Sequence, residues 1–231
     1  MGFWDLLYPR RCVGCGREGQ YFCDRCLAET SLETGWRCPE CNRASVGGVT
    51  HFGCRKKHGL DGLVTLASYR GLVRLGIHEL KYRFLTDMEK EMRGLAALRL
   101  KEGLKSRQGL ELRNLVKTKP AVVPVPLYWR RKNWRGFNQA EFIAKIVADE
   151  LNLPLKTDFL VRSKPTKPQV EMARKERIKN VKRVFGVEAE KLPEKALLVD
   201  DVWTTGATMR AAGAALKRAG VKVVWGLALS R

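Results

Sequence analysis

After about residue 60, apolar side chains along this chain follow two alternating patterns. Short runs of apolar residues are typical of buried strands, whereas apolar positions on one face of a longer segment indicate a helix. The predicted strands are residues 63–69, 121–126, 160–162, 184–187, 196–200 and 221–229. The predicted helices are residues 72–83, 87–106, 138–151 and 207–219. This alternation predicts an α/β domain over residues 61–231, in which helices flank a largely parallel sheet.

The first 60 residues follow neither pattern and hold all seven cysteines. Repeated C-x-x-C pairs in a chain of this kind are typical of zinc sites, because each pair supplies two thiolates from one tight turn. So few large apolar side chains cannot form a core unaided, so we expect the metal to be structural. We therefore predict a zinc-ribbon domain over residues 1–60, with a hinge near residues 59–63. The first predicted site consists of Cys12, Cys15, Cys23 and Cys26.

The second predicted metal site has three thiolates, and its fourth ligand is open. Cys38, Cys41 and Cys54 supply sulfur. His58 follows Cys54 by four residues and His51 precedes it by three; we favour His58, because a later ligand forms the second arm of a ribbon. Interleaved pairing of the C-x-x-C turns, and a second site that has lost its metal, remain alternatives. The sequence thus predicts one or two structural zinc ions.

The net charge of the chain indicates the kind of ligand or partner that it attracts. The 231-residue chain has a formal net charge of +20, which attracts nucleic acid or phosphorylated metabolites. Residues 162–183 hold nine basic and two acidic residues, and residues 128–135 hold four basic residues and two tryptophans. No apolar run is long enough for a membrane span, and the N-terminus lacks the basic region of a signal peptide, so we expect a cytoplasmic protein.

The segment 196–208 carries the sharpest chemical signal. An apolar strand ends in Asp200 and Asp201, and a loop of small residues then opens a helix. Backbone N–H groups and threonine hydroxyls at a helix N-terminus suit a phosphate, whereas adjacent carboxylates suit sugar hydroxyls, directly or through Mg²⁺. The candidate phosphate-binding residues are Thr204, Thr205, Gly206, Ala207 and Thr208.

This segment resembles the phosphoribosyl pyrophosphate (PRPP) motif of type I phosphoribosyltransferases. A second stretch, Pro-x-Pro followed by basic residues and Arg-Gly-Phe-Asn-Gln, resembles the ComF/GntX family, as does the N-terminal zinc ribbon. Further matches are Tyr69, Lys81-Tyr82, Gln169, Arg177, Asn180 and Phe185. The chain departs from the family pattern at Lys57, where the family often has a cysteine. The resemblance covers nearly the whole chain.

The resemblance implies roles for several of these residues. Asp200 and Asp201 would hold the ribose hydroxyls, and residues 204–208 would hold the 5′-phosphate. Lys81, Arg131 and Arg135 would contact the diphosphate. Residues 163–180, with Gln169 and Arg177, would form a flexible loop that closes over PRPP. No residue is assigned as a catalytic base, because no histidine or carboxylate in the pattern is placed for that role.

Two hypotheses of different class follow. The first is an Mg²⁺-dependent PRPP-binding phosphoribosyltransferase of unknown acceptor, acting in natural competence and DNA uptake. The second is a non-catalytic competence module that keeps the fold and binds single-stranded DNA or competence and recombination proteins. A PRPP-sensing regulator is a third option.

Overall fold

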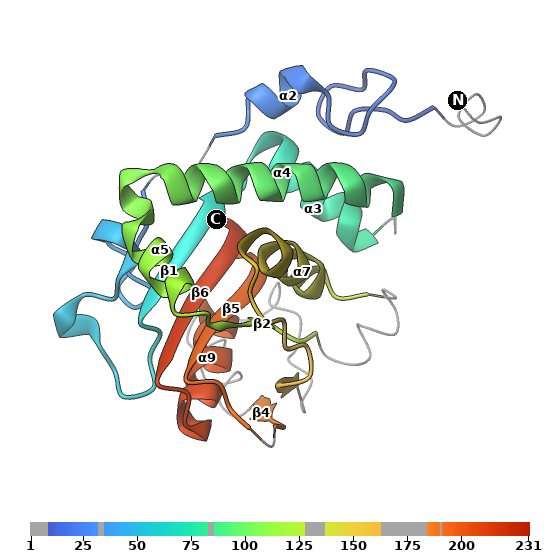
Figure 1. Ribbon diagram of the computed structural model, residues 1–231. Coiled ribbons are helices and arrows are strands. Elements are labelled where there is room, and N and C mark those ends of the chain that lie inside the picture. The colour runs from blue at the N-terminus through green and yellow to red at the C-terminus, as the bar shows by residue number, and fades with distance from the viewer. Residues whose placement is uncertain (1–8, 32–34, 83–85, 128–136, 163–183, 190) are drawn as a thin grey trace.

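The computed structural model describes residues 9–31, 35–82, 86–127, 137–162, 184–189 and 191–231 (Figure 1). The strands are β1 (Gly62–Ala67), β2 (Ala121–Pro124), β3 (Leu160–Arg162), β4 (Phe185–Val187), β5 (Lys195–Val202) and β6 (Val223–Ser230). The α-helices are α2 (Asp24–Ala28), α3 (Gly71–Tyr82), α4 (Thr86–Lys105), α5 (Leu110–Lys117), α7 (Gln139–Leu151) and α9 (Ala207–Ala219). Short 3-10 helices are η1 (Val46–Gly48), η2 (Phe52–Cys54) and η3 (Arg107–Gly109).

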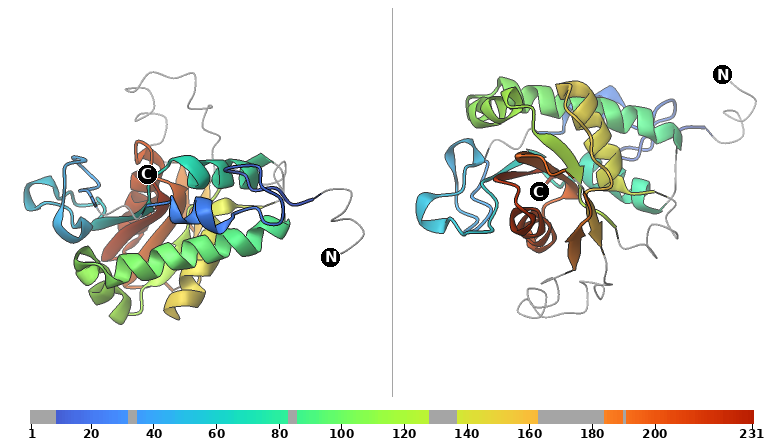
Figure 2. Two further views of the ribbon diagram at one scale, coloured as in Figure 1. Left: turned by 90° about the horizontal axis from the view of Figure 1, so that it is seen from above. Right: turned by 60° about the horizontal axis from the view of Figure 1, so that its bottom comes forward.

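Four strands form a parallel sheet in the order β1-β6-β5-β2. Side chains alternate across it, as the pleat of a strand requires. In β5, Leu197 and Val199 join the core under α4 and α7, whereas Ala196 and Leu198 join the core under α9. The predicted α/β architecture, a largely parallel sheet flanked by helices, is confirmed (Figures 1 and 2).

The short strands β3 and β4 pair antiparallel to each other in a separate two-stranded sheet. Arg162 pairs with Phe185, so the chain leaves β3 and enters β4 at neighbouring points. Phe185 is buried in the core under α9, which fixes this small sheet to the main body.

The N-terminal segment packs onto the body at two separate places (Figure 2). We call residues 9–31 the first ribbon and residues 35–61 the second ribbon. The first ribbon lies along α3 and α4: the Glu91 carboxylate on α4 accepts the backbone N–H groups of Tyr21 and Phe22, at 3.1 and 2.5 Å. Phe22 is only 1% exposed. The first ribbon therefore shares its core with the helices beneath it.

The second ribbon packs against β1, on the side of the molecule away from the N-terminus. The Trp36 indole N–H donates to the Thr65 carbonyl in β1 at 2.9 Å, and its ring is 2% exposed. The segment expected to be a hinge is buried instead: Leu60 is in the core, and the Asp61 backbone N–H donates to the Val224 carbonyl in β6. The Asp61 carbonyl accepts the Thr50 backbone N–H, and the Leu60 carbonyl accepts the Thr50 hydroxyl, so bonds from two directions hold residues 60 and 61 in place.

Among the described residues, no helix combines the length and the apolar character that crossing a bilayer requires.

Candidate functional site

Two adjacent carboxylates lie near the carboxyl end of β5, between the neighbouring strands β2 and β6. The Asp200 carboxylate accepts the backbone N–H of Asp201 at 2.9 Å, and the Asp201 carboxylate accepts the backbone N–H of Val202 at 2.8 Å. Both residues are partly exposed. These bonds orient two negative groups at the sheet edge where ligands of parallel α/β proteins bind.

The turn between β5 and α9, residues 203–206, has a geometry that only glycine can complete. Gly206 has a φ of 71° at the N-cap of α9, in the left-handed region. A Cβ on Gly206 would lie 2.1 Å from the ring of Trp203, which is itself buried. Trp203 is thus the floor of the turn, and Gly206 lies directly on it.

The first turn of α9 begins beside these carboxylates. Thr204 and Thr205 are exposed, and the Thr205 hydroxyl accepts the backbone N–H of Ala207 at 3.4 Å. Thr208 is partly exposed in the first turn. The first N–H groups of a helix have no partner four residues earlier, and the helix dipole adds partial positive charge there. The turn therefore combines carboxylates, hydroxyls and a helix N-terminus within nine residues.

Arg210 ties this turn to the second ribbon. Its guanidinium donates to the Thr205 carbonyl and to the Pro39 carbonyl, both at 2.6 Å, and lies 5.4 Å from the centroid of the Trp203 ring. Burial lowers the pKa of Arg210, and the nearby Glu40 carboxylate raises it. A half-buried guanidinium thus connects two segments that are far apart in the sequence.

The remaining residues predicted to bind PRPP are placed only in part. Lys81 belongs to the last turn of α3, the helix that follows β1. Arg131, Arg135, Gln169 and Arg177 lie outside the described residues. The segment that holds Gln169 and Arg177 connects the paired strands β3 and β4.

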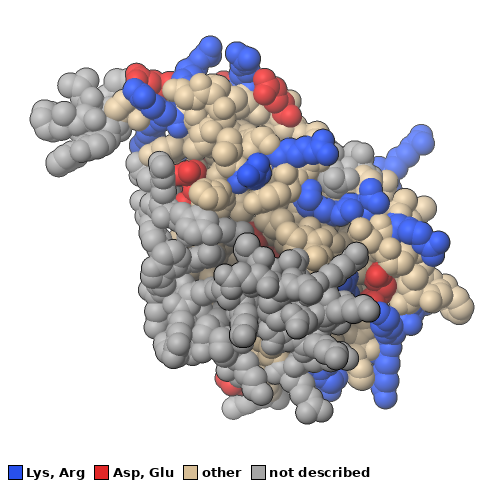
Figure 3. Space-filling model, turned by 180° about the vertical axis from the view of Figure 1, so that it is seen from behind, with Lys and Arg blue, Asp and Glu red and all other residues tan. Residues whose placement is uncertain are grey.

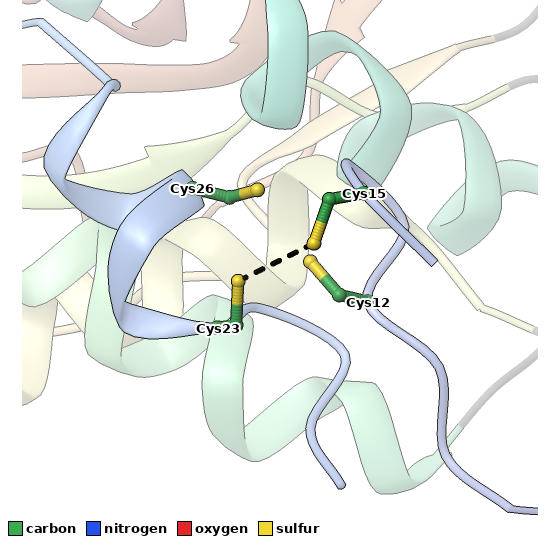
Figure 4. A group of neighbouring side chains, drawn as sticks. All are labelled: Cys12, Cys15, Cys23 and Cys26. Carbon is green, nitrogen blue, oxygen red and sulfur yellow. Dashed lines mark hydrogen bonds between the residues drawn. The ribbon is translucent and has the colours of Figure 1, made fainter. Parts of the chain in front are cut away.

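The structure brings the four cysteines of the first predicted site together (Figure 4). Their sulfur atoms all lie within 4.8 Å of one another, and the Sγ atoms of Cys15 and Cys23 are 3.6 Å apart. Sulfur atoms around a tetrahedral zinc ion, with Zn–S bonds of about 2.3 Å, are about 3.8 Å apart. The first cluster, Cys12, Cys15, Cys23 and Cys26, therefore fits zinc.

The thiols of the first cluster differ in acidity. Burial alone would raise the pKa of Cys12. Hydrogen bonds from the backbone N–H groups of Cys23, Cys15 and Gly14 outweigh burial and lower the pKa to about 6. Burial and the neighbouring cysteine thiols raise the pKa of Cys26 to about 12. Four sulfurs this close cannot all be thiolates without a cation among them, and a divalent metal is the usual solution.

The histidine beside the three cysteines of the second cluster is His51, whereas the sequence analysis favoured His58. Cys38, Cys41, His51 and Cys54 place their ligand atoms within 4.8 Å of one another. The Nδ1 atom of His51 is 3.3 Å from the Cys41 sulfur, and Nε2 donates to the Ala44 carbonyl at 3.0 Å. That outer bond leaves the Nδ1 lone pair directed at the cluster, the arrangement typical of a zinc-bound histidine.

The second cluster also has a cation beside it. The backbone N–H and the side chain of Arg43 lower the pKa of Cys41 to about 6. Hydrogen bonding to Cys41, followed by burial, raises the pKa of Cys54. The donor set of three sulfurs and one imidazole nitrogen fits a structural zinc ion.

Sequence reasoning missed Trp203 in the β5–α9 turn and Arg210 in the first turn of α9. The signal for Trp203 was its place directly before a turn rich in small residues. No local signal could have found Arg210, because Pro39 lies 171 residues away in the sequence.

Comparisons with known proteins agree with this geometry. Residues 138–229 match the phosphoribosyl transferase domain family, and residues 3–55 match the double zinc ribbon domain family. The chain is 27% identical over 222 residues to Competence protein F of Haemophilus influenzae, covering 94% of this chain and 83% of that protein. It is 30% identical over 192 residues to the DNA utilization protein YhgH of Salmonella typhimurium, covering 81% and 80%.

The chain belongs to the ComF/GntX family. In this ComF/GntX protein the phosphoribosyl transferase match contains the whole segment from Asp200 to Thr208, and the double zinc ribbon match contains all seven cysteines and His51. His58 lies beyond the matched ribbon residues, in keeping with its absence from the second cluster. The ribbon match and the two clusters together support structural zinc in the N-terminal segment.

Proposed function

We propose that this protein binds PRPP, with Mg²⁺, at the carboxyl edge of its parallel sheet and acts in DNA uptake or use. The observation that carries the PRPP proposal is the pair Asp200 and Asp201 in β5, followed at once by the glycine turn and the N-terminus of α9. The printed names of the relatives, Competence protein F and DNA utilization protein, support the biological setting.

Each part of the site suits one part of the ligand. Two adjacent carboxylates can accept hydrogen bonds from the two vicinal ribose hydroxyls, because each ionised carboxylate has two acceptor oxygens. The N–H groups and threonine hydroxyls at the start of α9 donate to a 5′-phosphate. When bound, Mg²⁺ would neutralise charge on the diphosphate. Lys81, Arg131 and Arg135 are the proposed cationic partners of that diphosphate, and Gln169 and Arg177 are proposed for the covering loop.

The test is PRPP binding, measured by calorimetry with Mg²⁺, on wild type and on Asp200→Asn/Asp201→Asn. Hydrogen bonds to charged groups contribute about 1.5–3 kcal/mol each. Weakening two of them is expected to reduce affinity by about 100-fold. If the double variant binds PRPP as tightly as wild type, the assigned ribose site is wrong.

A matched control is available on α7. Asp149 and Glu150 are also adjacent, exposed acids, and they form surface ion pairs with Arg93 and Lys101. Asp149→Asn/Glu150→Gln changes the net charge by the same amount in a different place, and we expect it to leave PRPP affinity unchanged. Pyrophosphate release on adding a nucleobase would then identify a transferase rather than a PRPP sensor.

A second candidate function, binding of single-stranded DNA, is favoured by one surface of the second ribbon. Phe52 is 87% exposed, and the Arg55 guanidinium lies 5.7 Å from the centroid of its ring. Arg55, Lys56 and Lys57 are all exposed, and His51 and Cys54 of the second cluster hold both ends of η2. Exposed aromatic rings beside cations are typical of surfaces on which bases stack.

Charge over the rest of the molecule agrees with a polyanionic partner. Lys and Arg side chains project from the described surface at several places in Figure 3, with acidic side chains among them, and the whole chain has a formal net charge of +20. The exposed Val46, on the same ribbon, has no charged residue beside it in the sequence. The two apolar side chains therefore differ in their surroundings, which allows a controlled comparison.

The test is binding of a fluorescent oligo-dT, followed by anisotropy at several salt concentrations. Stacking contributes about 1–3 kcal/mol per base, so Phe52→Ala is expected to weaken binding by about 5- to 100-fold. Val46→Ala is expected to bind as wild type does. Affinity should fall steeply with salt, because cations on the protein displace counterions from DNA. Equal binding by both variants, or binding insensitive to salt, would contradict the proposal; a docked protein partner would then explain the exposed ring.

A further inference from the structure

One side chain links the second cluster to the proposed PRPP site. Arg210 lies in the first turn of α9, where its own backbone N–H donates to the Gly206 carbonyl at 2.9 Å. Its two terminal nitrogens donate to the carbonyls of two different segments, one in the β5–α9 turn and one in the second ribbon. A single planar guanidinium therefore sets the distance between these two backbone segments.

The ribbon end of this link is at the second cluster. Pro39 directly follows Cys38, and Cys41 comes two residues later, so the Pro39 carbonyl lies inside the C-x-x-C turn. A metal held by both cysteines fixes the shape of that turn. The Glu40 carboxylate in the same turn is 6% exposed, accepts from Lys56 at 2.5 Å and acts electrostatically on Arg210.

The other end of the link is at the β5–α9 turn. Arg210 donates to the Thr205 carbonyl at 2.6 Å, and its guanidinium stacks near Trp203, the ring on which Gly206 lies. A shift of the guanidinium would therefore displace both the carbonyl and the floor of the turn. The N–H groups proposed to hold a phosphate belong to the residues that follow directly.

We propose that Arg210 is a positioning residue that couples zinc in the second cluster to PRPP binding at the β5–α9 turn. This inference rests on the proposed PRPP site. Zinc bound to Cys38 and Cys41 fixes the position of the Pro39 carbonyl. Arg210, bonded to that carbonyl, in turn fixes the position of the Thr205 carbonyl. The β5–α9 turn is thereby held in the conformation that binds the phosphate. Because coupling between two binding equilibria is reciprocal, PRPP must then raise the affinity of the second cluster for zinc by the same factor.

The choice of variant separates positioning from simple attraction. Arg210→Lys keeps the positive charge but has one flexible ammonium group in place of a planar fork, so it cannot hold the two carbonyls in the same fixed geometry. Arg210→Ala removes both charge and link. Arg218→Ala, at an exposed position on the same helix, removes a charge without touching either segment.

PRPP affinity is measured by calorimetry with Mg²⁺ on zinc-loaded protein, and zinc affinity by equilibrium competition with a chromophoric chelator. We expect both Arg210 variants to bind PRPP about tenfold more weakly, with both zinc sites still filled, and Arg218→Ala to match wild type. PRPP should raise the zinc affinity of the second cluster by about the same factor in wild type, and leave it unchanged in Arg210→Lys.

His51→Ala in the wild-type background provides a second measurement that does not depend on the folding of an Arg210 variant, and it should weaken PRPP binding. Added to Arg210→Lys, it should have no further effect, which completes a double-mutant cycle. Normal PRPP binding by Arg210→Lys, with zinc affinity insensitive to PRPP in wild type, would overturn the inference and leave the PRPP site standing. Wild type that fails to bind PRPP at all would overturn the proposed function and this inference with it.

Discussion

At the scale of single residues, two contacts of different kinds hold the imidazole ring of His51 in place. Nε2 donates to the Ala44 carbonyl at 3.0 Å, and Nδ1 faces the Cys41 sulfur at 3.3 Å. Such an outer hydrogen bond selects the tautomer that can bind a metal and also orients the ring. His51 therefore completes a site of three sulfurs and one nitrogen.

We expect His51→Ala to lose the second zinc ion, because three thiolates alone hold the metal less tightly. Zinc content, measured by atomic emission after dialysis against a moderate chelator, should fall from about two ions per chain to about one. His58→Ala is the matched control and should keep both ions. Loss of zinc from His58→Ala, with full retention in His51→Ala, would contradict the assignment made from the structure.

The role of a site residue could be predicted from the sequence where its partners are close to it in the chain. Where the partners are distant in the chain and meet only in the fold, the role could not be predicted. Asp200 and Asp201 at the end of β5 and Gly206 in the turn that follows lie close together in the sequence, so their chemistry is visible there. The choice of His51 over His58 depends on the path of the chain between Cys41 and Cys54. Arg210 acts on a carbonyl in another part of the chain, and no local pattern indicates that.

At the scale of elements, hydrophobic spacing located the strands of the main sheet to within about three residues at each end. Strand β5 extends past the apolar run to Val202, because its backbone continues to pair with β6 through the two aspartates. Helix α5 was missed, since it is short and polar, although Leu112 and Leu115 form its buried face. The predicted start of the helix at residue 138 is confirmed: Asn138 is the N-cap of α7, and its side chain accepts the Ala140 N–H at 3.2 Å.

At the scale of the whole molecule, the two ribbons pack onto one body at separate places. Arg99 on α4 is buried and donates to the Thr30 hydroxyl and the Leu27 carbonyl of the first ribbon, at 2.5 and 3.4 Å. Trp36 of the second ribbon is buried beside Leu66 of β1 in the same core that holds Phe22. Cysteine spacing predicted the metal sites, but it could not show that each would be built into the main core.

This arrangement predicts that zinc stabilises the whole molecule and not the ribbons alone. If chelation opens either cluster, Phe22 or Trp36 loses its support and apolar surface of the main core is exposed. Loss of a few kcal/mol lowers the Tm of a chain this size by about 10 °C. We expect calorimetry to show one cooperative transition that shifts down by about that amount after chelation and returns when zinc is restored. An unshifted main transition, with a separate low-temperature step for the ribbons, would mean that the ribbons fold independently and that their contacts with the body add little stability.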